Sequence, residues 1–442
     1  MLKNKIFGLI SLGCDKNRVD AERLLGEIKN CGYKVTDNIR EANILIVNTC
    51  AFLQSARQEA LDTVLECNTL RGGKLEKIVV SGCLPEKYIG ELFPELTEAD
   101  VFLGCSDSGT LIDSLERSYR EGRVNAVGQG KESLAERVLT TPEHYAYLKI
   151  ADGCNNHCTY CLIPKIRGKY RSESMEKLLA EASELGEVSE LILVAQDTTR
   201  YGTDIEGGNK LLVPLIRKLS ALDNIGSIRL LYCYPDQIDD SLIFELKNNS
   251  KLIKYLDIPF QHSEDRILKL MNRKGGRSEY LALLSKLREN IEGIAVRSTF
   301  IAGFPSETEE EAEALCNFLR EAKLTNCGFF AYSREPDTAA YHLKEQIPQR
   351  IKQRRVKNLY KTQAKISRDF LEQFVGKELK VLCDGIDYER NCFTGRAYFS
   401  APDIDGCVYF HAPEAMQGKY YSVKVTACGD YDLYAQTEDY NP

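Results

Sequence analysis

The chain of 442 residues lacks tryptophan, has only five histidines and contains no long apolar run. Apolar stretches such as Ile44 to Val47 and Leu191 to Ala195 fall far short of the ~20 residues that a membrane helix requires. Charged residues from Asp15 onward follow the start too soon for the apolar core of a signal peptide. We therefore expect a cytoplasmic protein without a membrane segment.

A general excess of positive charge is also missing. The 58 Lys and Arg residues face 65 Asp and Glu residues, which gives a formal net charge of −7. This balance argues against a generally basic nucleic-acid binder, although charge has to be counted by domain before the inference is used. At roughly 100–200 residues per domain, the length predicts two to four folded units.

Cysteine, in contrast, is abundant, with sixteen residues. Disulfides are rare in a reducing cytosol, and a chain of this length can bury a sufficient apolar core without them. The cysteines therefore indicate metal or redox chemistry.

The first third of the sequence alternates between strand-like and helix-like segments. We expect strands at Ile6 to Leu12, Ile44 to Asn48, Ile78 to Ser81 and Val101 to Leu103, and helices near Asp20 to Asn30, Ala56 to Thr69 and Glu86 to Leu92. This alternation predicts a doubly wound parallel α/β domain. Charged and small residues between Glu116 and Glu143 indicate a linker.

A second strand and helix series begins at Tyr145. Its six expected strands are Tyr145 to Ile150, Leu191 to Ala195, Ile228 to Cys233, Tyr255 to Ile258, Ala295 to Ile301 and Cys327 to Tyr332. Right-handed crossovers repeated this often curl a sheet into a full or partial barrel, which places chemistry at the carboxyl ends of its strands.

The last part of the chain changes character twice. Leu343 to Phe370 carries nine Lys and Arg residues and apolar residues at helical spacing, which predicts a long basic helix. After Gly376, Gly, Pro and Asp turns separate short strands, which predicts a small antiparallel β-barrel. Its expected strands are Leu379 to Cys383, Cys392 to Tyr398, Gly406 to Phe410 and Tyr421 to Ala427.

The strongest local motif is Cys154-x₃-Cys158-x₂-Cys161, directly after the first strand of the second series. Soft thiolate ligands suit an iron–sulfur cluster or zinc. A structural zinc site needs a fourth ligand, and His157 lies inside the cysteine loop, where it is badly placed to supply one. Three thiolates favour a cluster with one open iron.

This loop resembles that of the radical S-adenosylmethionine superfamily, whose cysteine motif follows the first strand of a partial (β/α)₆ barrel. The resemblance implies a 4Fe–4S cluster on Cys154, Cys158 and Cys161 as the catalytic centre. It also implies that S-adenosylmethionine binds the open iron and is cleaved to a 5′-deoxyadenosyl radical. Tyr160 matches the aromatic residue found between two ligands of this motif.

Cysteines also follow each expected strand of the first domain, at positions 14, 50, 83 and 105. The carboxyl ends of parallel strands converge on one edge of a sheet, so a second three-cysteine site is physically reasonable there. Spacing alone does not choose among the four residues, and a single cysteine at a strand end is more often a small buried residue.

The amino-terminal motifs are similar to those of the methylthiotransferases. The similar segments are Ser11 to Asp20, Val47 to Phe52 and Ser81 to Leu84. Together with the radical barrel and a carboxyl-terminal β-barrel of the TRAM type, the resemblance covers essentially the whole chain and implies domains at 1–125, 140–371 and 374–442. It implies that Cys14, Cys50 and Cys83 hold an auxiliary 4Fe–4S cluster, and it leaves Cys105 unassigned.

Two branches of this family modify different substrates, one an isopentenyl-adenosine of tRNA and the other the β-carbon of an aspartate in ribosomal protein uS12. Several segments resemble the ribosomal-protein branch. They are Cys14 to Arg18, Ile163 to Gly168, Ala195 to Thr199, Tyr232 to Pro235 and Tyr255 to His262. Cys233 is a departure from this pattern, because the ribosomal-protein branch commonly has another small residue at that position.

Charge offers an independent argument about the substrate. From Gly376 onward, six Lys and Arg residues face eleven Asp and Glu residues, a balance of −5. TRAM barrels usually bind RNA through basic surfaces, whereas an acidic barrel suits a basic ribosomal protein and makes tRNA a poor partner. The basic helix from Leu343 is the counter-evidence: it is either a solvated helix face or a contact with ribosomal RNA.

Two further segments are candidates for cofactor contacts. Gln196, Asp197 and Thr198 end the second strand of the barrel, where they form either a binding site for the methionine end of the cofactor or an ordinary loop. Gly303 and Phe304 follow the fifth strand in a motif that resembles the adenine-contacting segment of radical enzymes. The other interpretation of that motif is a strand end followed by a capped helix.

The resemblance implies a reaction that uses two molecules of S-adenosylmethionine. One donates its methyl group to sulfur held at the auxiliary cluster, and the second supplies the radical that removes a hydrogen from the substrate carbon. The implied partners are uS12, a sulfur donor and an electron donor such as a flavodoxin or ferredoxin. The alternatives are a tRNA methylthiotransferase and, from a different class, a non-catalytic iron–sulfur electron carrier or binding module.

Overall fold

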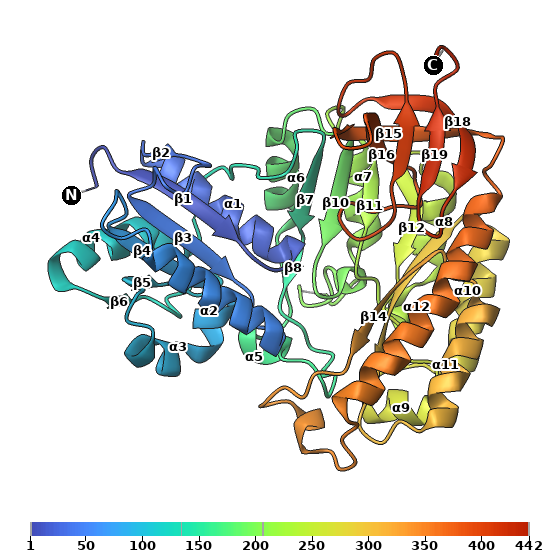
Figure 1. Ribbon diagram of the computed structural model, residues 1–442, viewed down its shortest axis with the longest axis horizontal. Helices are drawn as coiled ribbons and strands as arrows, with labels where there is room; N and C mark the ends of the chain where they lie inside the picture. The colour runs from blue at the N-terminus through green and yellow to red at the C-terminus, as the bar shows by residue number, and fades with distance from the viewer. Residues whose placement is uncertain (1, 134, 206, 441–442) are drawn as a thin grey trace.

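Three units follow one another along the chain in the computed structural model, which describes residues 2–133, 135–205 and 207–440. A parallel α/β unit comes first, a curved parallel sheet with outer helices is in the middle, and a closed β-barrel comes last (Figure 1). The expected fold class is confirmed.

The first unit is a six-stranded parallel sheet in the order β2-β1-β3-β4-β5-β6. The strands are β1 (Ile6–Ser11), β2 (Lys34–Val35), β3 (Ile44–Thr49), β4 (Lys77–Gly82), β5 (Val101–Phe102) and β6 (Val124–Asn125). Every residue of β3 is buried, because helices cover both faces of the sheet. These helices are α1 (Asp15–Asn30), α2 (Gln54–Asn68), α3 (Cys83–Glu95) and α4 (Leu111–Glu121). The order of strands reverses at β1, which makes the unit doubly wound.

The segment predicted as a linker is more ordered than its composition indicates. It begins inside α4 and includes β6, and its later part packs against α1. The backbone N–H of Val138 donates to the carbonyl of Glu22 at 3.2 Å, and that of Thr140 donates to the Glu22 carboxylate at 2.8 Å. A buried ion pair between Arg137 and Glu22 adds to these contacts. The linker prediction is therefore wrong for much of the segment, because its charged residues find partners more than 100 positions away in sequence.

The central unit contains all six expected strands as one parallel sheet in the order β14-β13-β12-β11-β10-β7. They are β7 (Tyr145–Lys149), β10 (Glu190–Val194), β11 (Ile228–Leu230), β12 (Leu252–Asp257), β13 (Ala295–Ala302) and β14 (Asn326–Ala331). Since β7 and β14 are the two edges, the barrel is partial, as expected. A small pair, β8 (Ala151–Asp152) and β9 (Arg171–Ser172), lies beside β7.

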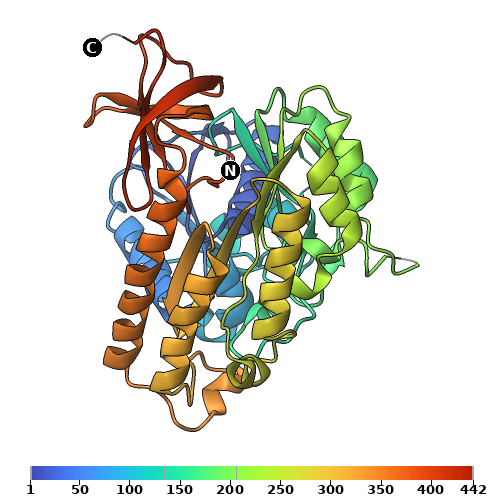
Figure 2. The same cartoon turned by 90° about the vertical axis from the view of Figure 1, so that its right-hand side faces the viewer.

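Helices cover the outside of this curved sheet and bury their apolar faces against it (Figure 2). They are α6 (Met175–Glu184), α7 (Leu212–Ser220), α8 (Asp240–Asn248), α10 (Arg277–Asn290) and α11 (Glu309–Ala322). Two short helices lie in loops instead: α5 (Ile163–Ile166) follows β8 and contacts α3, and α9 (Asp265–Leu270) follows β12. A capping box formed by Thr308 and Glu311 fixes the start of α11. The loops at the carboxyl ends of the strands are thereby held on a rigid support.

The basic segment forms α12 (Gln349–Glu372), which lies beside α11 and β14 and leads to the last unit (Figure 2). The helix starts six residues later than expected. Pro348 precedes it, and a proline disfavours helical conformation in the residue before it. The buried side chains of Leu359, Gln363 and Ser367 share the face that packs against the central unit.

The last unit is a closed barrel of five strands in the order β15-β16-β17-β19-β18. The strands are β15 (Glu378–Asp387), β16 (Cys392–Arg396), β17 (Val408–His411), β18 (Tyr420–Cys428) and β19 (Leu433–Gln436). The sequence predicts four of these strands and misses β19, which is only four residues long. β19 closes the barrel by pairing parallel to β17 and antiparallel to β18.

A buried group of charges joins the barrel to the central sheet. Glu190 of β10 accepts hydrogen bonds from Arg229 of β11 and Arg396 of β16, and Arg396 also donates to Asp384 at 2.9 Å. Burial opposes ionisation of Glu190, but the two arginines together hold its pKa below the usual value. The group stabilises the junction because each charge has a partner.

Among the described residues, no helix is long and apolar enough to cross a membrane.

Removing one charge from this junction is expected to destabilise the protein. Arg396→Gln leaves Asp384 and part of the Glu190 carboxylate without their cation, so the free energy of unfolding should fall by about 3 kcal/mol. The measurement is urea denaturation followed by tyrosine fluorescence. Arg390→Gln is the matched control, because Arg390 forms an exposed ion pair with Asp387 in the same barrel and its loss should have no measurable effect.

The same comparison has a predicted pH dependence. Because the pKa of Glu190 is lowered in the folded protein, its stabilising contribution is complete above the unfolded value of about 4.3 and is lost as the pH falls through the folded value. The difference between wild type and Arg396→Gln should therefore shrink in acid. A difference that stays constant from pH 7 to strongly acidic conditions would contradict this account.

Candidate active site

Cys14, Cys50 and Cys83 follow three neighbouring parallel strands of the first unit. Cys14 lies between β1 and α1, Cys50 follows β3, and Cys83 begins α3 directly after β4. Because β1, β3 and β4 are adjacent in the sheet, the three cysteines meet at its carboxyl edge. We call these three residues the N-terminal cysteine set.

The loops that carry this set are packed closely together. Gly13 has φ of 95°, and a Cβ atom there would lie 2.9 Å from Cβ of Cys50, so only glycine fits. The side chain of Asn17 donates to the carbonyl of Thr49 at 2.9 Å, and that of Asn48 donates to the carbonyl of Asn17 at 2.7 Å. These bonds fix the loop after β1 to the loop after β3.

The thiols of the set lie near enough to affect one another. Burial raises the pKa of Cys50 to about 11, and the nearby Cys83 and Cys14 add to the increase. Buried, crowded thiols lose their protons readily only when a positive charge lies nearby. A metal centre that binds thiolates supplies such a charge.

Cys83 differs from the other two cysteines of the set because it has two further neighbours, Cys105 and Arg167. Its sulfur lies 3.8 Å from that of Cys105 and 3.5 Å from Nη2 of Arg167. The Cys105 thiol and the Arg167 guanidinium lower the pKa of Cys83 to about 7. Cys105 therefore lies beside the N-terminal set, at a strand end as the sequence indicates.

Cys154, Cys158 and Cys161, the second cysteine set, lie on the loop between β8 and α5. Cys154 and Cys158 are buried. Backbone N–H groups of Asn156 and Ile163 point at the sulfurs of Cys154 and Cys161, at 3.5 and 3.4 Å. Backbone donors of this kind stabilise negative charge on sulfur and are typical of thiolate ligands.

Side chains from two other loops contact Cys158. The hydroxyl of Tyr234 lies 3.3 Å from its sulfur, and Nη1 of Arg273 lies 3.9 Å away. Arg273 is buried and stacks over the Tyr234 ring at 4.1 Å. Tyr160 is part of an apolar cluster that includes Phe304 and Met271. The second set thus has one fixed cation and a shell of rings that limits the access of water.

The polar residues after β10 differ in how they are engaged. Asp197 is fully buried and accepts from Asn156, Thr199 and Arg200 at 3.0, 2.6 and 2.9 Å. The Thr198 hydroxyl donates to the carbonyl of Leu231 at 2.6 Å. Gln196 donates to Asp152, but its buried Oε1 has no partner among the described residues. Of the three predicted cofactor contacts, Gln196 has an acceptor left for a ligand.

Gly303 and Phe304 follow β13, as the sequence predicts. Gly303 has φ of 73°, and a Cβ atom there would lie 2.4 Å from Cγ of Lys352 in α12. The N–H groups of both residues donate to Glu307 at 2.6 and 3.0 Å. Phe304 is buried edge-on against Tyr332 with ring centroids 5.2 Å apart. The segment is thus a tight turn, and whether it also contacts adenine stays a prediction.

A buried network of charges connects the two cysteine sets. Arg167, which ends α5, donates to Asp20 of α1 and to Asp152 of β8, both at 2.8 Å. Lys149 of β7 also pairs with Asp20 and Asp152. Although burial opposes ionisation of Asp152, Arg167 and Lys149 hold its pKa far below the usual value. Arg167 thereby contacts Cys83 on one side and Asp152, two residues before Cys154, on the other.

Asp152 continues this network into the central unit. Its Oδ1 accepts from the N–H of Gly153 at 2.8 Å and from Nε2 of Gln196 at 2.9 Å. The network therefore reaches from the N-terminal set, through Arg167 and Asp152, to the start of the second cysteine loop. We call Asp20, Lys149, Asp152 and Arg167 the interdomain charge network.

The sequence singles out six cysteines as predicted ligands but misses most of the network. Asp20, Arg167 and the Tyr234 segment lie in motifs that the sequence singled out, whereas Asp152 and Arg273 carried no separate signal. Arg167 contacts Asp152 and Asp20, which lie 15 and 147 positions away in sequence, and local patterns do not reveal contacts over such separations.

Three soft thiolates in each cysteine set suit an iron–sulfur cluster, which stays a prediction for both sets. Within the described part of the chain, no three His, Cys, Asp or Glu side chains are arranged to hold one ion. Tetrahedral zinc, with Zn–S bonds of about 2.3 Å, requires its sulfurs within about 4 Å of one another. A cuboidal cluster is larger and accepts three more widely spaced thiolates.

Comparisons with known proteins divide the chain in the same order as the structure. The model of the uncharacterized protein family UPF0004 matches residues 6–104, that of the Radical SAM superfamily matches 148–319, and that of the TRAM domain matches 375–437.

Relatives with similar sequences match over nearly the whole chain, and each has the name ribosomal protein uS12 methylthiotransferase RimO. The relative from Clostridium botulinum is 45% identical and the alignment covers 99% of both chains. That from Lachnoclostridium phytofermentans is 44% identical, with 98% of this chain and 100% of the relative covered. That from Geobacter sulfurreducens is 42% identical, with 98% of both covered.

Solved structures with a similar fold are radical enzymes of low sequence identity. The methyltransferase TsrM from Kitasatospora setae, with cobalamin and a 4Fe–4S cluster bound, matches with a TM-score of 0.54 and 15% identity over 76% of this chain and 77% of that chain. OxsB with aqua-cobalamin and S-adenosylmethionine bound matches with a TM-score of 0.51 and 12% identity over 82% and 58%. At these identities the likeness concerns the fold alone.

A substitution beside Cys154 tests the second cysteine set. Gly153 has φ of 75°, and a Cβ atom there would lie 2.2 Å from the backbone oxygen of Lys169, which cannot move independently. Gly153→Ala should displace the loop and lower the iron bound per chain after anaerobic reconstitution. Iron and sulfide analysis measures the effect.

Gly186→Ala is the matched control, because Gly186 has φ of 73° and open space around it. Both variants carry the roughly 1 kcal/mol strain of a left-handed alanine, but only one crowds the cysteine loop. Equal iron loss in the two variants would show that backbone strain alone, and not the packing at Gly153, controls iron binding.

Proposed function

The chain belongs to the family of ribosomal protein uS12 methylthiotransferases, which are radical S-adenosylmethionine enzymes, and on this basis we propose that it adds a methylthio group to the β-carbon of an aspartate in uS12. The reaction would use two molecules of S-adenosylmethionine and two 4Fe–4S clusters. We place this activity in the cytoplasm, where ribosomal proteins are found.

The observation that carries the proposal is the meeting of two sets of three cysteines. The N-terminal set follows the carboxyl ends of three parallel strands, and the second set lies on the single loop after β7 and β8. Arg167 links the two by contacting Cys83 and Asp152. A protein that only carried electrons would need no second strand-end site facing a radical barrel. Two reactive centres held at fixed separation suit a reaction in which one supplies the radical and the other the group to be transferred.

The second cysteine set would hold the cluster that cleaves S-adenosylmethionine. Cys154, Cys158 and Cys161 supply three thiolates and leave the fourth coordination position for the amino and carboxylate groups of the cofactor. When bound, such a cluster supplies the electron that splits the cofactor into methionine and a 5′-deoxyadenosyl radical.

The surrounding side chains have defined tasks in this proposal. The buried guanidinium of Arg273 compensates the negative charge of the thiolates at Cys158. The unpartnered Oε1 of Gln196 accepts a hydrogen bond from the amino group of the bound cofactor. Tyr160 and Phe304, which share an apolar cluster, exclude water so that the radical meets only the substrate carbon. Asp197, Thr198 and Gly303 shape the loops around them.

The N-terminal cysteine set would hold the auxiliary cluster. Cys14, Cys50 and Cys83 would supply three thiolates, and an open iron of the cluster would hold the sulfur that is methylated and transferred. Cys14 is the exposed member of the set, so sulfur from a donor would reach this edge of the site from solvent. An electron donor such as a flavodoxin or ferredoxin completes the list of proposed partners.

The carboxyl-terminal barrel suits a basic protein substrate. Its balance of −5 complements a ribosomal protein, and Tyr388, Tyr434 and Ile386 are exposed on its surface at 86%, 42% and 51%. Exposed tyrosines beside acidic groups are common in protein interfaces. We propose that this barrel, within predicted domain limits of 374–442, presents uS12 to the site between the limits 1–125 and 140–371.

Single cysteine substitutions separate the two proposed roles. Purified Cys158→Ala, reconstituted with iron and sulfide and reduced, should lose about four of eight irons and form no 5′-deoxyadenosine from S-adenosylmethionine. Cys50→Ala should also lose about four irons, but it should still form 5′-deoxyadenosine and fail to modify uS12. Chromatography of the nucleoside and mass spectrometry of uS12 are the measurements.

Cys67→Ala is the control, because Cys67 is buried in α2 away from both sets. It should behave as wild type in iron content and product formation. Wild-type protein with only four irons, or Cys50→Ala that still modifies uS12, would contradict the auxiliary site.

A further inference from the structure

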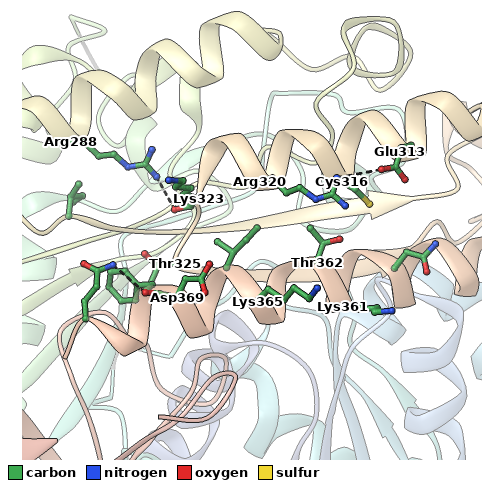
Figure 3. Close-up of a pocket in the computed structure, with 15 residues that line it drawn as sticks. Arg288, Glu313, Cys316, Arg320, Lys323, Thr325, Lys361, Thr362, Lys365 and Asp369 are labelled. Carbon is green, nitrogen blue, oxygen red and sulfur yellow. Dashed lines mark hydrogen bonds and ion pairs between the residues drawn. The ribbon is translucent and has the colours of Figure 1, made fainter. Parts of the chain in front are cut away.

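A hollow of about 760 Å³ lies between α11 and α12 on the helical outer face of the central unit (Figure 3). Five cationic side chains line it: Arg288, Arg320, Lys323, Lys361 and Lys365. We call these five residues the basic groove. None of them belongs to either cysteine set or to the interdomain charge network.

The positive charge of the groove is not neutralised by its own acidic residues. Only Glu313 and Asp369 are acidic among the residues that line it, against five cations, in a chain of net charge −7. Glu313 pairs with Arg320 at 3.4 Å, and both side chains are more than half exposed, so this pair is weak.

The remaining cations fall into two kinds. Arg288 donates to the carbonyls of Ala322 and Lys323 and so neutralises the carboxyl end of α11. Lys323, Lys361 and Lys365 are exposed and form no ion pair with any described residue. Three lysines are thus left with their charge directed to solvent along one groove.

These residues form an extended row of positive charges along the groove rather than a closed pocket. Lys361 and Lys365 are four residues apart on α12, which puts them on one face about 6 Å apart along the helix axis. Lys323 and Arg320 stand on the opposite side, at the end of α11 (Figure 3). Cations on both sides of a groove match a chain of regularly spaced anions.

The uncharged lining favours phosphate over an acidic protein segment. Asn358, Thr362 and Gln373 add neutral hydrogen-bonding side chains, which commonly contact phosphate oxygens. The apolar lining is already engaged: the Phe370 ring packs on Phe374 and Phe399, each with centroids 5.4 Å away. A protein partner would be expected to use a free apolar anchor, which the lining does not offer.

We propose that the basic groove binds the phosphate backbone of RNA. Because the carboxyl-terminal barrel has a balance of −5, the groove supplies the RNA contact that the barrel surface disfavours. Combined with the proposed function, on which this extension rests, RNA contact at the groove means that the enzyme docks on an RNA-containing ribosomal particle while it modifies uS12.

The test is a binding measurement with a fluorescein-labelled uridine RNA of about 16 nucleotides, followed by anisotropy at several salt concentrations. Lys361→Glu/Lys365→Glu should weaken binding roughly tenfold and reduce the slope of log K against log salt by about 1.4, since each lost phosphate contact contributes about 0.7 for a single strand. The milder Lys361→Gln/Lys365→Gln should fall between this variant and wild type.

Lys218→Glu/Lys247→Glu is the matched control, because it changes net charge equally at exposed lysines of α7 and α8 outside the groove. It should bind RNA with no more than a small general loss. Both double variants should form 5′-deoxyadenosine as wild type does, which shows that they are folded.

Three results would overturn the assignment: no RNA binding by wild type, equal losses in the two double variants, or equally tight binding of poly-glutamate, which would indicate an acidic protein partner. The assay needs neither cluster nor uS12. If RNA binds at the groove while uS12 is never modified, the groove assignment stands and the proposed function fails.

Discussion

A buried group of charges joins the N-terminal sheet to the central sheet. Arg167 bridges Asp20 and Asp152 at 2.8 Å each, and Lys149 completes the group. Burying these charges is costly unless each has a partner, and leaving one unpaired costs about 3–5 kcal/mol. All of these charges are therefore paired only when the two sheets dock in one relative position.

This docking places the cysteine-bearing loops of the N-terminal sheet beside the cysteine loop of the central unit. In a parallel sheet the carboxyl ends of the strands meet at one edge, so loops that carry cysteines converge there. The interdomain charge network holds one such edge beside the other, with Cys83 on one side of Arg167 and the Asp152–Cys154 segment on the other. A second buried group, Glu190 with Arg229 and Arg396, fixes the barrel. Reactive centres fixed in this way need no large motion to meet.

Local sequence patterns predicted the strands and helices that follow from the spacing of apolar residues along the chain. Apolar runs predicted all six central strands. The C-x₃-C-x₂-C motif pointed to one set of three cysteines, whereas the family resemblance, and not strand-end position alone, chose Cys14, Cys50 and Cys83 over Cys105. The patterns missed β19, which has only four residues, and mistook part of the segment before Tyr145 for a linker, because its stability comes from contacts of Val138 and Thr140 with Glu22. Arg167 lies in the segment Ile163 to Gly168 that the sequence singled out, but local patterns did not reveal its partner Asp20, which is 147 positions away.

The central claim is that this arrangement modifies uS12. It is tested most directly by mass spectrometry of ribosomal proteins and tRNA nucleosides from cells with and without the gene. The account predicts that uS12 carries the mass of one methylthio group on an aspartate only when the gene is present, and that tRNA is unchanged. Unmodified uS12 together with gene-dependent methylthio-adenosine in tRNA would contradict it.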